Sequence, residues 1–204
     1  MKKFLSVILS GLIILTGLNA KAEETNMANK KILVVYFSKT GEQYGVGNIT
    51  EGNTAIIAKM IAEKTKADLF EIKLKNDNYP TAYKALTEAA LTEKKANVRP
   101  ELNADVANFA DYDIVFMGSP NWWADMPMAL YSFIEAHDWN GKTIAPFVTH
   151  EGSGLSSIPN KIKTATGANI TDGLAIYGHI AQNNREQAAQ DVAKWLKKLG
   201  FNGE

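Results

Sequence analysis

Apolar strand-like runs alternate with helix-like segments along most of the chain, and this alternation restricts the fold more than any other feature. The run ILVVYF at 32–37, for example, is continuous and rich in β-branched and aromatic residues, which is typical of a strand buried on both faces. The strand-like runs are 32–37, 68–74, 112–117, 143–149 and 174–177, and the helix-like segments are 54–64, 82–95, 127–136, 155–166 and 184–199. The pattern predicts an α/β fold, in which helices cover both faces of a parallel sheet.

Five parallel strands permit the spatial order 2-1-3-4-5. In a sheet of this order, ligands bind beyond the carboxyl ends of strands one and three, where the order reverses. Pro146 weakens the fourth strand, because proline cannot donate a ladder hydrogen bond. The loops that follow the strands are therefore where we look for function.

Residues 1–22 have the pattern of a cleaved signal peptide. Lys2 and Lys3 precede an apolar run at 4–18, and Ala20-Lys21-Ala22 fits the cleavage site. The run has 15 residues, fewer than the roughly 20 that span a bilayer; an uncleaved N-terminal anchor is the alternative. We therefore expect a signal peptide at 1–22, a polar leader at 23–30 and one domain at 31–204. We also expect export, with the periplasm as destination, and no stable membrane span after cleavage.

Composition excludes several classes of protein. The chain has no cysteine, so it has neither disulfides nor a catalytic thiol. Removal of residues 1–22, which hold three lysines and no acidic residue, leaves 19 basic and 22 acidic side chains. A net charge near −3 without a Lys/Arg-rich block is no signature of nucleic-acid binding. No His/Asp/Glu spacing predicts a metal site.

The loop after the first strand, SKTGEQYGVGNITEGNT at 38–54, opens a helix. A helix N-terminus carries unpaired amides and partial positive charge, hydroxyl side chains add donors, and glycine lets the backbone approach a ligand. The loop therefore suits a phosphate, although it matches neither a Walker A loop nor Gly-x-Gly-x-x-Gly. A polar linker with an ordinary helix cap is the alternative.

Two further loops follow the third and fourth strands. GSPNWWADMP at 118–127 places two adjacent tryptophans at a strand exit, where indoles can stack on a flat ligand. The alternative is that one or both cover the end of the sheet. THEGSGLSS at 149–157 contains two glycines whose amides can bond ring carbonyls, and a simple turn is its alternative.

The three loops, in this order, resemble those of the flavodoxin-like family, specifically its small bacterial long-loop branch, over about residues 31–200. The resemblance implies a flavodoxin-like three-layer sandwich with noncovalent FMN. By the same resemblance, the phosphate is held by Ser38, Thr40, Asn53 and Thr54, the isoalloxazine by Pro120, Asn121, Trp122 and Trp123, and its third side by Thr149, Glu151, Gly152, Ser153 and Gly154.

The first loop departs from the family's compact phosphate motif, because EQYGVGNITEG separates SKTG from NT. Our interpretation is that residues 42–52 loop out while both ends still hold the phosphate. The extra segment then forms a lid, with Tyr44 over the flavin or substrate. Which half contacts the phosphate stays open.

His150, in the fourth-strand loop, is the candidate catalytic residue, either for protonation or for bonding the N1–C2 edge of the flavin ring. An exposed loop histidine is the alternative. His137 and His179 are assigned to structure or surface.

Three functions remain open. The leading hypothesis is an exported FMN-dependent oxidoreductase that passes electrons from NAD(P)H to a small acceptor such as a quinone. The others are a one-electron carrier that uses a redox partner protein, and a non-redox module that has lost FMN. The absence of glycine in 121–125 and the small net charge favour the first, because carriers use a cheap peptide flip at glycine. The resemblance is also compatible with a homodimer.

Overall fold

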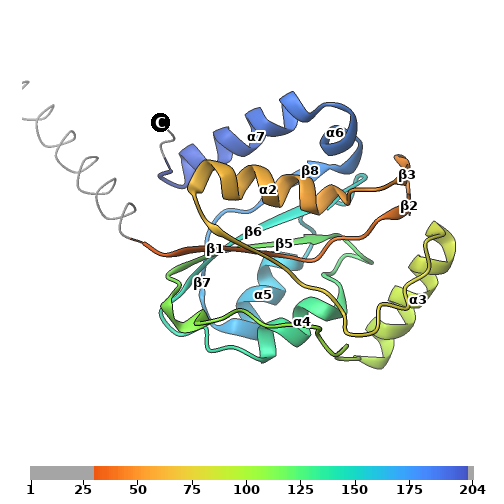
Figure 1. The fold of residues 1–204 in the computed structure, drawn as a ribbon, viewed down its shortest axis with the longest axis horizontal. Coiled ribbons are helices and arrows are strands. Elements are labelled where there is room, and N and C mark those ends of the chain that lie inside the picture. The colour runs from red at the N-terminus through yellow and green to blue at the C-terminus, as the bar shows by residue number, and fades with distance from the viewer. Residues whose placement is uncertain (1–29, 202–204) are drawn as a thin grey trace, which may run out of the picture.

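A central parallel sheet organises the protein, whose computed structural model describes residues 30–201 (Figure 1). Its strands, from one edge to the other, are β4 (Asp68–Glu71), β1 (Ile32–Tyr36), β5 (Ile114–Pro120), β6 (Thr143–His150) and, sharing the last position, β7 (Asn169–Ile170) and β8 (Leu174–Tyr177). All pairings in this sheet are parallel. With β7 and β8 counted as one interrupted strand, the order is 2-1-3-4-5, so the predicted α/β fold is confirmed.

Helices form a layer on each face of the sheet (Figure 1). One layer contains α2 (Asn53–Thr65), α6 (Gly178–Asn183) and α7 (Arg185–Lys198). The other side carries α4 (Met128–Glu135), α5 (Ile158–Thr166), the short 3-10 helix η1 (Phe109–Asp111) and α3 (Tyr83–Ala96), which lies toward the carboxyl ends of the strands. None of the helices within residues 30–201 is long and apolar enough to cross a membrane.

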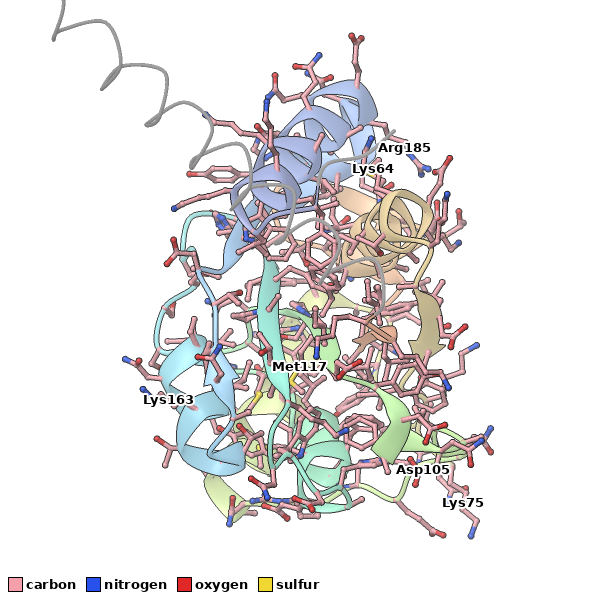
Figure 2. All side chains as sticks on the ribbon, turned by 90° about the vertical axis from the view of Figure 1, so that its left-hand side faces the viewer. Lys64, Lys75, Asp105, Met117, Lys163 and Arg185 are labelled. Carbon is pink, nitrogen blue, oxygen red and sulfur yellow. The ribbon has the colours of Figure 1, made fainter. Side chains whose placement is uncertain are left out.

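The hydrophobic core has two halves, one on each side of the sheet. Neighbouring residues of β1 point to opposite faces: Val34 packs with the α2 and α7 side chains, and Val35 with those of α4 and α5. Seen along the sheet, Met117 of β5 lies in the middle, while charged side chains point outward (Figure 2). Both faces of the central strands are buried, which explains why their sequences are continuously apolar.

Pro146 explains why the fifth strand is interrupted. The Ile144 carbonyl of β6 accepts a hydrogen bond from the Thr171 amide, so β6 bonds its outer neighbour there. Pro146, two residues further, faces the same side and has no N–H to donate. Pairing with β7 stops at Ile144 and resumes with β8 at Phe147. The proline thus weakens the edge pairing while β6 keeps its full register with β5.

The structure differs from the sequence expectations in a few elements. The segment that loops out forms a hairpin of β2 (Gly41–Gln43) and β3 (Gly47–Ile49), which the sequence did not predict. Helix α6 was also missed, β4 is shorter than 68–74, and α5 begins at Ile158 rather than at 155. The expected signal peptide at 1–22 and nearly all of the leader at 23–30 lie outside the described residues.

Gly118 is expected to be intolerant of any side chain. It pairs with Phe147 across β5 and β6, and a Cβ atom at this position would lie 2.1 Å from the Phe147 ring. We expect Gly118→Ala to lower the free energy of unfolding by about 1–3 kcal/mol, because the core cannot expand freely. Urea denaturation measures this. Combination with Phe147→Leu should recover part of the loss; additive losses would contradict the proposed clash.

Candidate functional site

The two halves of the predicted phosphate loop meet at the N-terminus of α2. The Ser38 hydroxyl oxygen accepts a hydrogen bond from the Ala55 amide over 3.1 Å. Ser38 therefore caps the helix in place of Gly52, which has the cap position but no side chain. The contact is close, since a Cβ atom on Gly52 would lie 2.1 Å from the Ser38 Oγ atom. The halves are thus adjacent in space although residues 42–52 separate them.

The first amides of α2 point away from the helix body. Those of Asn53 and Thr54 have no acceptor within the helix, and the dipole adds partial positive charge there. Thr40, also predicted for the phosphate, is exposed nearby in sequence. An anion placed at this helix end is therefore favoured by several donors.

The side chains of Asn53 and Thr54 hold neighbouring elements. Asn53 Oδ1 accepts from Gln182 Nε2 over 2.8 Å, and the same amide nitrogen donates to the Glu51 carbonyl over 2.6 Å. The Thr54 and Thr149 hydroxyls bond each other over 2.7 Å, and both residues are buried. These bonds connect α2 to α6 and to the end of β6. The hydroxyl groups of Thr54 and Thr149 are therefore hydrogen-bonded to each other without a ligand.

The β2–β3 hairpin reaches from α3 to the fourth-strand loop. At its base, the Glu42 amide donates to the Thr81 carbonyl over 2.8 Å, and the Glu42 carboxylate accepts from the Tyr83 amide over 2.9 Å. At its tip, a Cβ atom on Gly45 would lie 3.4 Å from the Glu151 carboxylate. The segment does loop out at the edge where the site was expected (Figure 1). Its action as a lid stays a prediction.

Gln43 carries a buried donor without an acceptor. Its side-chain nitrogen has almost no solvent exposure and no hydrogen-bond partner. Gln43 alternates with Glu42 along β2 and so shares the face of Gly41, which packs against Thr81. An unmet donor at this depth costs about 1–3 kcal/mol, which a bound acceptor would recover.

After β5, the chain makes a tight turn with unusual backbone geometry. The Trp122 and Asp125 backbones exchange two hydrogen bonds of 2.9 and 3.1 Å, and Trp123 and Ala124 between them both have φ of +57°. This geometry is that of a type I′ turn, which normally uses asparagine and glycine. The missing glycine therefore does not keep this backbone out of positive φ, and our sequence argument from its absence is wrong.

The structure separates the two tryptophans. Trp122 packs edge-on against Phe37 and Tyr79, with ring centroids 5.6 and 5.3 Å apart. Trp123 is 51% exposed, and its indole nitrogen donates to the Thr87 carbonyl of α3 over 2.9 Å. Trp122 thus covers the end of the sheet, and Trp123 is the one that presents an open ring.

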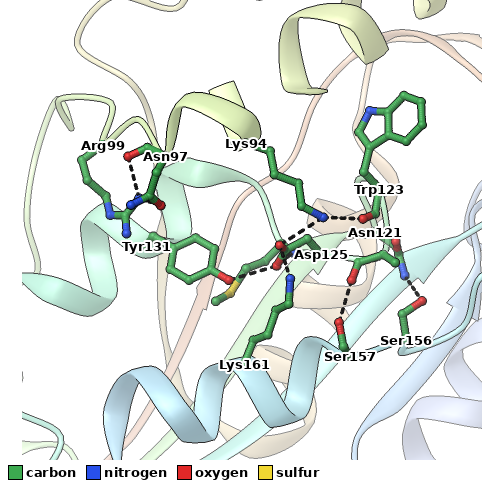
Figure 3. A network of polar contacts seen from close by, with 12 residues as sticks. Lys94, Asn97, Arg99, Asn121, Trp123, Asp125, Tyr131, Ser156, Ser157 and Lys161 are labelled. Carbon is green, nitrogen blue, oxygen red and sulfur yellow. Dashed lines mark hydrogen bonds and ion pairs between the residues drawn. The ribbon is translucent and has the colours of Figure 1, made fainter. Parts of the chain in front are cut away.

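A buried carboxylate supports the turn (Figure 3). The Asp125 side chain is 5% exposed and forms ion pairs with Lys161 of α5 and, over 3.3 Å, with Lys94 of α3. It also accepts from the Tyr131 hydroxyl over 3.0 Å, and burial raises the pKa of Tyr131 with further help from this carboxylate. The charge is therefore paired from three elements, as a buried charge requires.

The same network holds the carbonyls of both positive-φ residues (Figure 3). Lys94 donates to the Trp123 carbonyl over 2.6 Å, and the Ser157 hydroxyl donates to the Ala124 carbonyl over 2.9 Å. Strain of this kind persists where surrounding bonds determine the conformation. The turn is consequently held in one shape.

Asn121 joins the third-strand loop to the fourth. Its backbone amide donates to the Thr149 carbonyl over 2.9 Å. Its side-chain nitrogen donates to the Gly154 carbonyl and to the Ser156 hydroxyl, both over 2.9 Å. Pro120, at the end of β5, pairs with Thr149 in the same ladder. Two loops predicted to line one ligand are thus bonded to each other.

The glycine-rich part of the fourth-strand loop is open. A Cβ atom on Gly152 or Gly154 would meet nothing within 4 Å, and both have positive φ. Ser153 is exposed and accepts from the Ser156 hydroxyl through its carbonyl. The predicted approach of this backbone to a ligand is sterically allowed, and it stays a prediction.

Glu151 turns toward the end of the fifth strand. It accepts from the His179 amide over 2.7 Å and from the His179 ring over 2.8 Å. A Cβ atom on Gly178 would lie 3.0 Å from Glu151 and 2.2 Å from the Asn53 side chain. His179, which the sequence assigned to structure or surface, therefore holds the carboxylate.

His150 is half-buried and packs against Tyr177, with ring centroids 4.5 Å apart and an angle of 50° between the rings. Its Nδ1 atom accepts from the Gly152 amide over 2.9 Å, so the remaining proton of a neutral ring belongs on Nε2. Burial lowers the pKa of His150; Glu151 opposes this shift and His179 adds to it. The structure thus favours the neutral imidazole, which can donate a hydrogen bond from Nε2.

Within residues 30–201, no group of three or more His, Cys, Asp or Glu side chains could bind a metal ion. The site is built instead from backbone amides, hydroxyl and amide side chains, and one exposed indole. Such an edge can hold a phosphate at α2 and a flat ring near Trp123.

Comparison with known proteins identifies the family. Residues 31–199 match the flavodoxin family model. The chain therefore belongs to the flavodoxin family. No curated protein matches it.

Solved structures of Bacteroides proteins are similar over most of the chain. A proposed flavoprotein from Bacteroides eggerthii is 26% identical, with a TM-score of 0.65, covering 85% of this chain and 100% of its own. Another from Bacteroides uniformis is 29% identical, with a TM-score of 0.63, covering 82% and 98%. A flavoprotein from Lactobacillus acidophilus, solved in complex with FMN, is 23% identical and has a TM-score of 0.56 over 72% and 92%; it shares the fold.

Sequence reasoning missed the residues that act from a distance. Asp125, Lys94 and Lys161 come from a loop and two helices, and no local spacing connects them. Gln43 and Gln182 were also missed, because amide side chains have no characteristic motif. The one available signal was Asp125 itself, an acidic residue beside two tryptophans and within a buried segment.

The imidazole of His150 is expected to titrate below its usual pKa of about 6.5. In that range the unfolded chain binds a proton that the folded chain does not, so stability should fall as pH drops below about 6.5. NMR titration of the ring protons measures the pKa, and His150→Gln should remove this part of the pH dependence. A midpoint above 6.5 would contradict the described burial.

Asp125→Asn should destabilise the protein by about 2 kcal/mol, because it leaves two lysines beside a buried amide. The estimate is below the 3–5 kcal/mol typical of a fully buried pair, since the Lys94 and Lys161 side chains are 33% and 34% exposed. Urea denaturation provides the measurement. Asp172→Asn, which breaks an exposed pair with Lys198, is the matched control and should leave stability unchanged.

Proposed function

We propose that the chain binds FMN noncovalently at the carboxyl edge of its sheet and acts as a redox protein. The observation that carries this proposal is the 3.1 Å bond between the Ser38 hydroxyl and the Ala55 amide, which rejoins the interrupted loop at the start of α2. The FMN complex of the Lactobacillus acidophilus protein, which has the same fold, supports the choice of flavin.

The residues present fit the phosphate of FMN. Because the Ser38 oxygen accepts from Ala55, its proton is free to be donated. The Asn53 and Thr54 amides and the exposed Thr40 hydroxyl add donors. The Glu151 carboxylate accepts hydrogen bonds from the His179 amide and ring, which hold it at the edge of this site.

The residues near the expected ring position have distinct tasks. When bound, FMN would supply hydride and electron transfer. Trp123 presents a flat face at 51% exposure, and the backbone beneath it is fixed by Lys94 and Ser157. His150, neutral with its proton on Nε2, would donate a hydrogen bond to the N1–C2 edge of the flavin ring. Asn121 keeps the two ring-side loops at a constant separation.

We infer a two-electron reaction with a small acceptor. NAD(P)H, a proton and a quinone would give NAD(P)⁺ and a hydroquinone, with the hydride and proton accounting for both added hydrogens. A turn whose two carbonyls are both bonded resists the backbone rearrangement on which a one-electron carrier relies. The mature net charge near −3 also provides little attraction for a basic partner protein. Export is part of the proposal and rests on the pattern of residues 1–22 alone.

The purified protein, mixed with excess FMN and freed of unbound flavin, should retain about one flavin per chain. It should then oxidise NADPH and reduce menadione in equal amounts, as the visible spectrum and absorbance at the NADPH band record. Retained flavin without turnover would favour the one-electron carrier. If neither FMN nor FAD is retained, both redox functions fail and the non-redox module is left.

Gly52→Ala provides a structural test of the phosphate site. The new methyl group would lie 2.1 Å from Ser38 Oγ and 2.7 Å from the Lys39 carbonyl, so it must separate the two halves. We expect FMN affinity to fall at least about tenfold, the effect of losing one charged hydrogen bond. Flavin fluorescence titration measures it, with circular dichroism as the check on folding. Unchanged affinity would show that the halves do not act together.

A further inference from the structure

Exposed aromatic side chains gather at the rim of the proposed FMN site. Six large hydrophobic residues within 30–201 are exposed, and the four aromatic ones are Tyr44, Tyr83, Trp123 and Tyr177. They belong to the hairpin, α3, the third-strand loop and the end of β8, all of which meet at the carboxyl edge of the sheet (Figure 1). An exposed aromatic cluster of this kind marks a contact surface.

Three of these rings lie along α3. The Trp123 indole is bonded to the Thr87 carbonyl, and Tyr83 precedes Thr87 by one helical turn. The Tyr44 ring lies against Tyr83, with centroids 5.7 Å apart and a tilt of 34°. We call Tyr44, Tyr83 and Trp123 the α3 aromatic row.

The fold positions this row while leaving it open to solvent. Tyr44 is 63% exposed, although its hairpin is bonded at the base to Thr81 and Tyr83. Trp123 is 51% exposed on a strained turn that Lys94 holds. Apolar rings that are fixed and yet uncovered are prepared for a flat partner, because little ordering remains to be done on binding.

We propose that Tyr44 and Tyr83 of the α3 aromatic row, next to the Trp123 indole that is assigned to FMN, bind an uncharged, flat aromatic electron acceptor of the quinone class by ring stacking, and that the inserted hairpin serves to bring Tyr44 to it. This inference rests on the proposed function and names the place of its second substrate. The Glu42 carboxylate, bonded to the Tyr83 amide, lies beside the row. It repels an anionic dinucleotide and leaves an uncharged quinone unaffected, so the row suits the acceptor rather than NAD(P)H.

The test uses menadione with the FMN-loaded protein and three variants of the row. Tyr44→Ala and Tyr83→Ala should each raise KM for menadione roughly 3- to 10-fold, the value of one lost ring contact. The maximal rate, KM for NADPH and FMN affinity should stay unchanged, and Tyr44→Phe should behave as wild type. Val98→Ala, two residues beyond the C-terminal end of α3 and 40% exposed, is the matched control.

Equilibrium dialysis of menadione provides a second measurement that does not depend on turnover. It is done on both FMN-loaded and FMN-free protein. In whichever of the two forms binds menadione, Tyr44→Ala should raise the dissociation constant by the same factor as it raises KM. Unchanged KM and dissociation constants in both alanine variants would overturn the inference, as would a rise in KM for NADPH instead. Failure to retain FMN is seen in the visible spectrum and overturns the proposed function separately.

Discussion

The hydrogen bond from the Ala55 amide to the Ser38 hydroxyl is the contact on which the proposed site depends. It joins the two ends of the segment at residues 42–52, so a hairpin can be inserted there without displacing the start of α2 from the end of β1. Gly52 allows this approach, because any side chain there would occupy the place of Ser38. The unpaired amides at the helix end, which favour an anion, thereby stay next to Ser38 despite the interruption.

A second constraint acts on the other side of the proposed ring position. Asp125 is removed from water and is stabilised by lysines from two helices, which links α3, α5 and the turn at Trp123. Lys94 uses the same ammonium group to bond the Trp123 carbonyl, so the charged network and the strained backbone support each other. The phosphate side and the ring side are therefore each held by several bonds, while aromatic side chains such as Tyr44 remain exposed.

The spacing of apolar and polar residues along the chain predicted the layers of this fold, because buried parallel strands such as β1 need apolar residues on both faces. Nonlocal effects account for the rest. The break between β7 and β8 depends on which way Pro146 faces, and the Asp125 pairs join segments distant in sequence. The loops of the site were placed correctly at one edge, but the roles of Trp122 and Trp123 differ because one ring meets Phe37 while the other turns outward.

The central claim is that the rejoined loop binds a phosphate, and comparison of FMN with riboflavin tests it most directly. The two ligands share the ring and differ in the phosphate alone. We expect the wild-type protein to bind FMN at least about 100-fold more tightly than riboflavin, as two charged hydrogen bonds provide, and Ser38→Ala to reduce this ratio. Equal affinity for the two ligands in fluorescence titrations would contradict the account.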